Sequence, residues 1–185
     1  MGKIIADIFL LLALPLVSFV GGAWIMAEMS NHQLVTRRLL ETGQKPLNQR
    51  LGYGLAEVQR CWGALNKDAI LAERRFLELD LVFPFVYGGA FVTSLLIAWA
   101  LLSRPFNPLW FMAPVVITIL ADWVENLTQL NQIKRYLISG ETGLDANWIR
   151  VASVATTVKW LFSSVITIFL LTLAGLIIAR VFKSV

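Results

Sequence analysis

Charged residues are missing from four long stretches of the chain. An α-helix needs about 20 apolar residues to cross roughly 30 Å of hydrocarbon, and it satisfies its backbone hydrogen bonds internally, as lipid requires. Three of the stretches have that length, and the third in chain order reaches it only by including Asp122. The charge-free stretches are residues 8–27, 81–103, 105–121 and 160–179. They predict four transmembrane helices, at about residues 4–27, 80–103, 108–130 and 152–182.

Residues 28–79 form the only long polar segment, and their apolar positions recur at helical spacing. Charged residues fall mainly on the other faces, so we expect an amphipathic helix that lies on the membrane surface or over the bundle. We expect the first part of this segment, Met29 to Thr42, to continue the first helix, which then ends at Gly43 and Pro46. The apolar residues of the expected amphipathic helix are Leu55, Val58, Trp62, Leu65, Ala69, Ala72 and Phe76.

Short local signals predict the ends of the third and fourth helices. Asn107 is suited to cap the third helix, with Pro108 as its first residue. Ser139 and Gly140 form a stop signal, and Asp145 is suited to cap the fourth helix. The link between the second and third helices is short, which makes these two helices antiparallel neighbours.

The fold class that follows is an all-α integral membrane protein. We expect one membrane domain, residues 1–185, in which four transmembrane helices form a bundle and an amphipathic interfacial helical segment joins the first two helices. The composition agrees, because 57% of the residues are hydrophobic and the mean hydropathy is +0.69, outside the usual range of soluble proteins.

Composition also narrows the chemistry. A single cysteine, Cys61, and a single histidine, His32, leave no Cys/His cluster for zinc or haem, so no metal site is predicted and no motif names a cofactor. The net charge is +4, but the basic residues are scattered among acids and bracket the apolar stretches. We therefore expect no nucleic-acid partner and expect the basic residues to contact acidic lipid headgroups.

The candidate site consists of ionisable residues close to the expected hydrocarbon. A charge at the centre of a bilayer costs about 2.5 to 3.5 kcal/mol, so such residues usually face a bundle interior or a polar cavity. At about 1.5 Å per residue from the link, Tyr87 lies about 24 Å deep, Asp122 about 22 Å and Glu125 about 27 Å. Lys159 of the fourth helix falls at the same level, and Asp80 lies a little further out. The predicted catalytic groups are Asp80, Tyr87, Asp122, Glu125 and Lys159.

Further residues are expected to surround these groups. Thr118, Asp122, Glu125, Asn126 and Gln129 share one stripe of the third helix, which must face protein or water. Glu28, at the end of the first helix, adds another carboxylate at that boundary. The predicted ligand contacts are Asn126, Gln129, Trp123 and Trp160.

Charge also predicts an orientation. With four spans both termini lie on one side, and most basic residues lie on the side of the candidate site. The positive-inside rule then predicts that the site is cytoplasmic, in a bacterial inner membrane.

The carboxylates of Asp122 and Glu125 have two possible roles. Asp122 and Glu125 could act as a general acid and base. Burial and the repulsion between the two carboxylates would then make their pKa values differ. They could instead form a structural ion pair with Lys159, or with Arg74 and Arg75, that holds the helices in register.

The sequence leaves two functions open, and it does not decide whether the protein is an enzyme. The first is acid/base chemistry on, or binding of, a lipid-soluble isoprenoid, sterol or quinone-like molecule in a carboxylate-lined intramembrane pocket. The alternative is a non-enzymatic accessory or scaffold subunit of a larger membrane complex. The expected partners are membrane lipid, such a small molecule, and a membrane protein or a second copy of the chain. A proton or ion pathway is disfavoured, because the third helix has no polar residue between Pro108 and Thr118.

Overall fold

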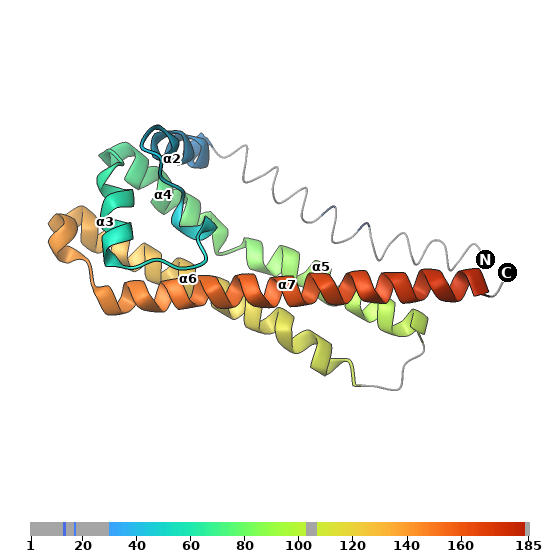
Figure 1. The fold of residues 1–185 in the computed structure, drawn as a ribbon. Helices are drawn as coiled ribbons and strands as arrows, with labels where there is room; N and C mark the ends of the chain where they lie inside the picture. The colour runs from blue at the N-terminus through green and yellow to red at the C-terminus, as the bar shows by residue number, and fades with distance from the viewer. Residues whose placement is uncertain (1–12, 14–16, 18–29, 103–106, 184–185) are drawn as a thin grey trace.

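The computed structural model describes residues 30–102 and 107–183, together with positions 13 and 17 (Figure 1). All regular structure in the longer described ranges is helical. The first predicted transmembrane helix, residues 4–27, and Glu28 lie outside the described residues. The α-helices are α2 (Ser30–Glu41), α3 (Leu55–Gly63), α4 (Lys67–Asp80), α5 (Phe83–Leu102), α6 (Leu109–Ser139) and α7 (Ala146–Lys183). Two short 3-10 helices are η1 (Leu47–Gln49) and η2 (Gly140–Gly143).

Three helices run lengthwise beside one another, α5, α6 and α7, and α6 is antiparallel to both neighbours (Figure 1). Within the described residues, three helical segments are long and apolar enough to cross a membrane: Lys67–Leu102, Leu109–Gly143 and Ala146–Arg180. The 38 residues of α7 correspond to a length of about 57 Å, well beyond the thickness of the hydrocarbon. Part of this bundle must therefore project beyond any bilayer that it crosses.

The projecting end of the bundle is covered by α2, α3 and α4 (Figure 1). The single amphipathic helix expected around residues 55–76 is in fact two helices, α3 and α4. The chain turns between them, and the Asn66 side chain accepts a hydrogen bond from the Ala69 amide at 2.9 Å, which caps α4. Helical periodicity survives across this break because both helices pack on the same core. The helices α2, α3 and α4 thus fold over the end of the bundle, and we call them together the cap.

Two apolar cores lie at opposite ends of the molecule. The cap core combines α2, α3 and α4 with the projecting parts of α6 and α7, and its largest fully buried side chains include Trp62 and Phe76. The bundle core joins α5, α6 and α7 near their other end, around Leu95, Val115 and Ile166. Between the two cores, these helices carry buried polar residues, which together form a polar layer.

Helix ends lie within one residue of the predicted signals. The Asn107 side chain accepts a hydrogen bond from the Leu109 amide at 3.0 Å, but α6 begins at Leu109, so Pro108 is the N-cap and not the first helical residue that the sequence predicted. α6 ends at Ser139, after which Gly140 takes a φ of 62°, a left-handed conformation that favours glycine. The Asp145 carboxylate accepts from the Asn147 amide at 2.9 Å and caps α7.

One close helix contact depends on glycine. A Cβ atom added to Gly88 of α5 would lie 2.3 Å from Ile119 Cδ1 of α6. The neighbouring Gly89 has no such contact within 4 Å. Gly88 thus lets α5 approach α6 closely just below the polar layer.

Candidate functional site

The polar layer is built on one face of α6. Asp122 is 3% exposed, Glu125 and Asn126 are 0% exposed, and Gln129 is 2% exposed. Their spacing of three and four residues places them on one stripe, as the sequence predicts, and that stripe faces the protein interior. Thr118, the remaining member of the predicted stripe, is also buried and donates to the Pro114 carbonyl oxygen at 2.9 Å.

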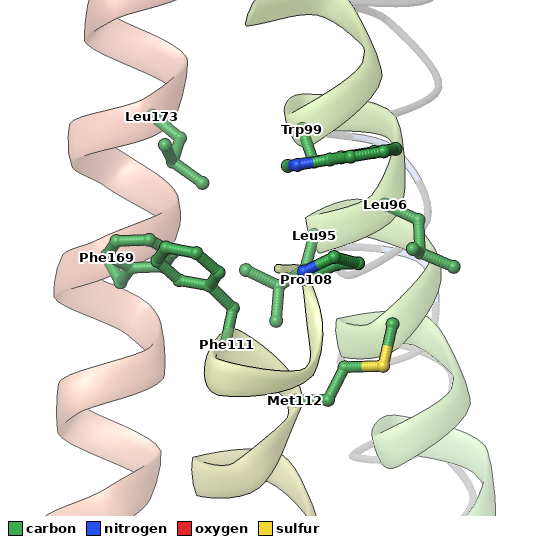
Figure 2. A pocket seen from close by; sticks show the side chains of 8 residues that line it. All are labelled: Leu95, Leu96, Trp99, Pro108, Phe111, Met112, Phe169 and Leu173. Atoms are coloured by element: carbon green, nitrogen blue, oxygen red, sulfur yellow. The ribbon is translucent and has the colours of Figure 1, made fainter. Parts of the chain in front are cut away.

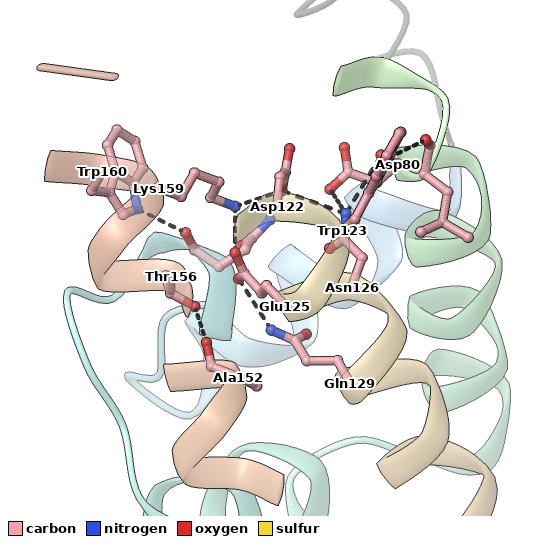
Figure 3. A network of polar contacts seen from close by, with 12 residues as sticks. Asp80, Asp122, Trp123, Glu125, Asn126, Gln129, Ala152, Thr156, Lys159 and Trp160 are labelled. Carbon is pink, nitrogen blue, oxygen red and sulfur yellow. Dashed lines mark hydrogen bonds and ion pairs between the residues drawn. The ribbon is translucent and has the colours of Figure 1, made fainter. Parts of the chain in front are cut away.

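Lys159 of α7 neutralises part of this stripe (Figure 3). Its ammonium nitrogen lies 3.0 Å from Asp122 Oδ1 and 2.5 Å from Glu125 Oε2. Only 16% of the Lys159 side chain is exposed, so the ion pairs are largely shielded from solvent. Buried charges persist only when they are paired, and the two carboxylates supply that pairing.

The other side of the stripe meets α4 and α5. The Tyr87 hydroxyl donates to Asp122 Oδ2 at 3.0 Å. The amide nitrogen of Asn126 lies 3.1 Å from Asp80 Oδ2 and 3.5 Å from Asp122 Oδ1 (Figure 3). Four helices, α4, α5, α6 and α7, therefore contribute to one connected set of side chains. We call the set the carboxylate network: Asp80, Tyr87, Asp122, Glu125, Asn126, Gln129 and Lys159.

Tyr53 extends this network from the segment before α3. The Gln129 amide donates to the Tyr53 hydroxyl at 2.9 Å and to Glu125 Oε1 at 3.2 Å. The Tyr53 amide donates to the Ser153 hydroxyl of α7 at 2.8 Å. Burial, and then the nearby charge of Glu125, raises the pKa of Tyr53. The phenol therefore remains protonated at neutral pH.

The sequence analysis did not find Tyr53. The residue lies between Gly52 and Gly54 in a polar stretch without periodicity, and 76 positions separate it from Gln129. Thr157 also donates to the Leu51 carbonyl oxygen, so the segment is held along α7 by long-range bonds. An aromatic residue flanked by two glycines was the only local signal.

The two predicted tryptophan contacts lie at the edges of the network. Trp123 Nε1 donates to the Leu81 carbonyl oxygen at 3.0 Å, and Trp160 Nε1 donates to the Asn48 carbonyl oxygen at 3.3 Å. Each ring therefore fastens α6 or α7 to a neighbouring segment. The ring of Trp123 also lies 4.8 Å from that of Phe85, on the side where α5 meets α6.

One predicted alternative pairing is wrong. Arg74 is bound to Glu78, its neighbour one turn along α4, at 2.8 Å, and it forms no ion pair with the network. Arg75 is exposed. Residues one turn apart on a helix meet without any tertiary contact, which explains the local pairing of Arg74.

The network contains more acceptors than donors. Asp80, Asp122 and Glu125 supply three carboxylates, whereas Lys159 is the single cation paired with them among the described residues. The side-chain oxygens of Asn126 and Gln129 are buried and have no hydrogen-bond partner in the described part of the protein. No group of three or more His, Cys, Asp and Glu side chains there is arranged to hold a metal ion. The surplus oxygens are thus suited to accept protons or hydrogen bonds from a donor.

Two hollows in the described part of the protein lie outside the polar layer. An apolar hollow of about 10 Å³ lies among α5, α6 and α7 near their far end, where Phe111 and Phe169 stack 4.4 Å apart (Figure 2). A wider surface hollow is lined by residues of α3 and by Glu141. The network reaches the surface at two edges, through half-buried Tyr87 and through Lys159.

Comparisons of the chain with protein-family models, with curated proteins and with solved structures find no match.

Proposed function

We propose that this chain is an integral membrane protein whose carboxylate network receives the polar group of a lipid-soluble molecule and exchanges hydrogen bonds or a proton with it. The observation that supports the proposal best is that the layer buries three carboxylates, whereas Lys159 is the single cation paired with any of them among the described residues. A purely structural pair needs one carboxylate for each cation. The surplus carboxylates cost free energy in the folded state, and such a cost is typical of functional sites.

The depth of the network suits a ligand that enters from the bilayer. The charge-free stretch 160–179 of α7 is about 30 Å long, which matches the hydrocarbon, and Lys159 directly precedes it. The network then lies at the boundary between the bilayer and the cap. A molecule with an apolar body can remain in lipid while its polar group reaches this level.

Tyr87 and Asp122 are the most suitable pair for proton exchange. Tyr87 is half-buried at the edge formed by α5 and α6, and its hydroxyl already donates to Asp122. The rings of Phe83 and Phe91 contact the Tyr87 ring at centroid distances of 5.3 Å and 6.1 Å. These rings cover part of Tyr87, and a general acid or base gains strength in a water-poor site.

The test replaces the two acids of α6 by amides. Asp122→Asn and Glu125→Gln keep the shape of each side chain but remove its negative charge. We expect both variants to lose lipid-soluble molecules that co-purify with the wild type, as measured by mass spectrometry of the gently extracted, full-length protein. Glu141→Gln, which changes an exposed acid beyond α6, is the matched control and should retain them. Unchanged co-purification in both network variants would refute the proposal.

A role as an accessory subunit of a larger membrane complex is the second candidate. Large apolar side chains are exposed on the cap, among them Leu40 at 66%, Leu51 at 74% and Leu79 at 55%. Exposed apolar residues are common on any protein, but a partner that covers the cap would bury these. Purification in mild detergent distinguishes the candidates. A stoichiometric protein partner that is lost in Leu51→Asp but kept in Asp122→Asn supports the accessory role.

We further propose that the protein resides in a bacterial inner membrane with the cap in the cytoplasm. The described basic residues outside the charge-free stretches lie mainly on the cap and on the adjoining ends of α6 and α7, for example Arg38, Lys134 and Arg150. This distribution follows the positive-inside rule. Labelling of Lys134→Cys in a Cys61→Ser background by an impermeant maleimide tests the orientation: protection in intact cells and reaction after permeabilisation are expected, and reaction in intact cells would reverse it.

A further inference from the structure

Asp80 forms no ion pair with a cation of the described residues. It is 5% exposed. Its Oδ2 atom accepts from an uncharged donor, the Asn126 amide, at 3.1 Å. Glu73, two turns earlier on α4, is also buried and adds a further carboxyl group to this side. Lys159 is engaged with Asp122 and Glu125.

An unpartnered acceptor lies beside Asp80. Asn126 is fully buried, and its Oδ1 atom has no hydrogen-bond partner among the described residues. The nitrogen of the same amide is held against Asp80 and Asp122, which fixes the plane of the amide and leaves the oxygen on the corner turned away from that nitrogen. An acceptor in such a position is satisfied by an N–H or O–H group and is repelled by another anion.

Aromatic rings form the edge of the bundle next to Asp80. Trp123 is fixed to the carbonyl oxygen of Leu81, the residue that follows Asp80, and its ring packs on Phe85. Phe83 and Tyr87, which lie one turn apart on α5, pack together with their ring centroids 5.3 Å apart. The faces of aromatic rings attract cations, most strongly in a desolvated setting. A carboxylate, an amide oxygen and aromatic rings in one place favour an organic cation.

We infer that the polar group received by the network is a lipid-soluble amine in its ammonium form, bound at Asp80 between the Asn126 side-chain oxygen and the aromatic edge of Trp123. This inference rests on the function proposed above and specifies the head group of its ligand. Lys159 shows that the network accepts a primary ammonium, because its own ammonium contacts two carboxylates. A phosphate or carboxylate head group would add negative charge to buried carboxylates that already exceed the cations paired with them.

The test compares three head groups on one apolar chain. The full-length protein in phosphatidylcholine nanodiscs is titrated with dodecylamine, dodecanol or dodecanoate, and binding is measured by native mass spectrometry and by the shift of the thermal transition. We expect dodecylamine to bind at least tenfold more tightly than dodecanol and dodecanoate not to bind. Asp80→Asn should weaken dodecylamine binding tenfold or more, whereas Glu78→Gln, an exposed acid on the same helix, should leave it unchanged.

A second variant keeps the test decisive if Asp80→Asn does not fold. Trp123→Leu removes the aromatic face without touching a carboxylate and should weaken dodecylamine binding several-fold while dodecanol binding stays the same. Tighter binding of dodecanol or dodecanoate, with loss of that binding in Asp122→Asn, would overturn the amine assignment but leave the proposed function intact. Equal binding of all three probes by the wild type and by Asp80→Asn would also overturn the amine assignment. The co-purification experiment tests the proposed function separately.

Discussion

The ammonium group of Lys159 lies 2.5 Å from a carboxylate oxygen of Glu125, and both groups belong to helices that pack closely, α6 and α7. The Glu125 side chain is completely buried. In this setting water cannot solvate Glu125 if Lys159 is removed, and it can solvate Lys159 only in part if the carboxylates are removed, because 16% of that side chain is exposed. The pair therefore couples the packing of α6 on α7 to the charge state of the network.

Removal of the cation should destabilise the protein strongly. Lys159→Met keeps the length of the apolar stem but leaves Asp122 and Glu125 buried without a counter-charge. Breaking one side of a buried ion pair typically costs about 3–5 kcal/mol. We expect a large fall in the thermal transition of the detergent-solubilised protein. Lys134→Met, at an exposed position of α6, should change it little.

Neutralising the partner should restore part of that loss. In Lys159→Met combined with Glu125→Gln, one buried charge no longer needs a counter-ion, so the double variant should be more stable than Lys159→Met alone. A double-mutant cycle on the thermal transition measures the coupling. Strict additivity of the two changes would show that the ion pair does not contribute.

Two adjacent glycines should respond differently to alanine. Gly88→Ala places a methyl group against Ile119, and overpacking of this kind costs about 1–3 kcal/mol unless the neighbour moves. Gly89→Ala meets nothing within 4 Å and should be neutral or slightly stabilising, because alanine favours a helix over glycine by about 1 kcal/mol. The difference between their thermal transitions is the measurement. Ile119→Ala should rescue Gly88→Ala if the contact is the cause.

Loss of the Tyr53 hydroxyl should leave a buried donor, the Gln129 amide, without one of its partners. In Tyr53→Phe the Gln129 amide loses its 2.9 Å partner inside the protein, which costs about 1–3 kcal/mol. Tyr136→Phe serves as the control, because Tyr136 is only half-buried and its ring packs on Trp62 from the edge of the cap. Equal stability of Tyr53→Phe and the wild type in denaturant titrations would contradict the bond.

Tyr53 should also make the free energy of unfolding depend on pH in the alkaline range. The pKa of Tyr53 is raised in the folded protein above its ordinary value of 10.0, so the folded state holds the phenol proton more tightly than the unfolded chain. This contribution is complete below pH 10 and is lost as the pH rises towards the folded-state pKa. The stability gap between the wild type and Tyr53→Phe should therefore shrink above pH 10. A gap that widens there would be inconsistent with the raised pKa.

Cys61 should be almost inert in the folded protein. Burial, and then the nearby Glu73, raises the pKa of the Cys61 thiol from 9.0 to about 12. At pH 8 the reactive thiolate would then be about 10⁻⁴ of the total, against roughly a tenth at the ordinary pKa. Maleimide should label the native protein slowly and the denatured protein at once. Rapid labelling of the native protein would show that the cap opens readily.

Local sequence signals account for most of the secondary structure. The hydrogen bond of Asn107 just before α6, the stop at Gly140 and the cap at Asp145 depend on residues only two or three positions away, so they could be recognised without any tertiary contact. The stripe on α6 follows from helical periodicity alone. The break between α3 and α4 was missed because both sides of it keep the same hydrophobic spacing.

By itself the sequence determined that the chain forms long apolar helices and that Tyr87, Asp122, Glu125 and Lys159 lie at one level along them, with Asp80 a little further out, because the rise per residue of a helix is constant. Only the tertiary structure decided which of these groups are partners. It joined Lys159 to both acids of α6, left Asp80 with an amide and brought Tyr53 to Gln129. Such pairings depend on how each helix is rotated and on where a loop returns to the bundle. Those features are set by the packing of two apolar cores on either side of the polar layer.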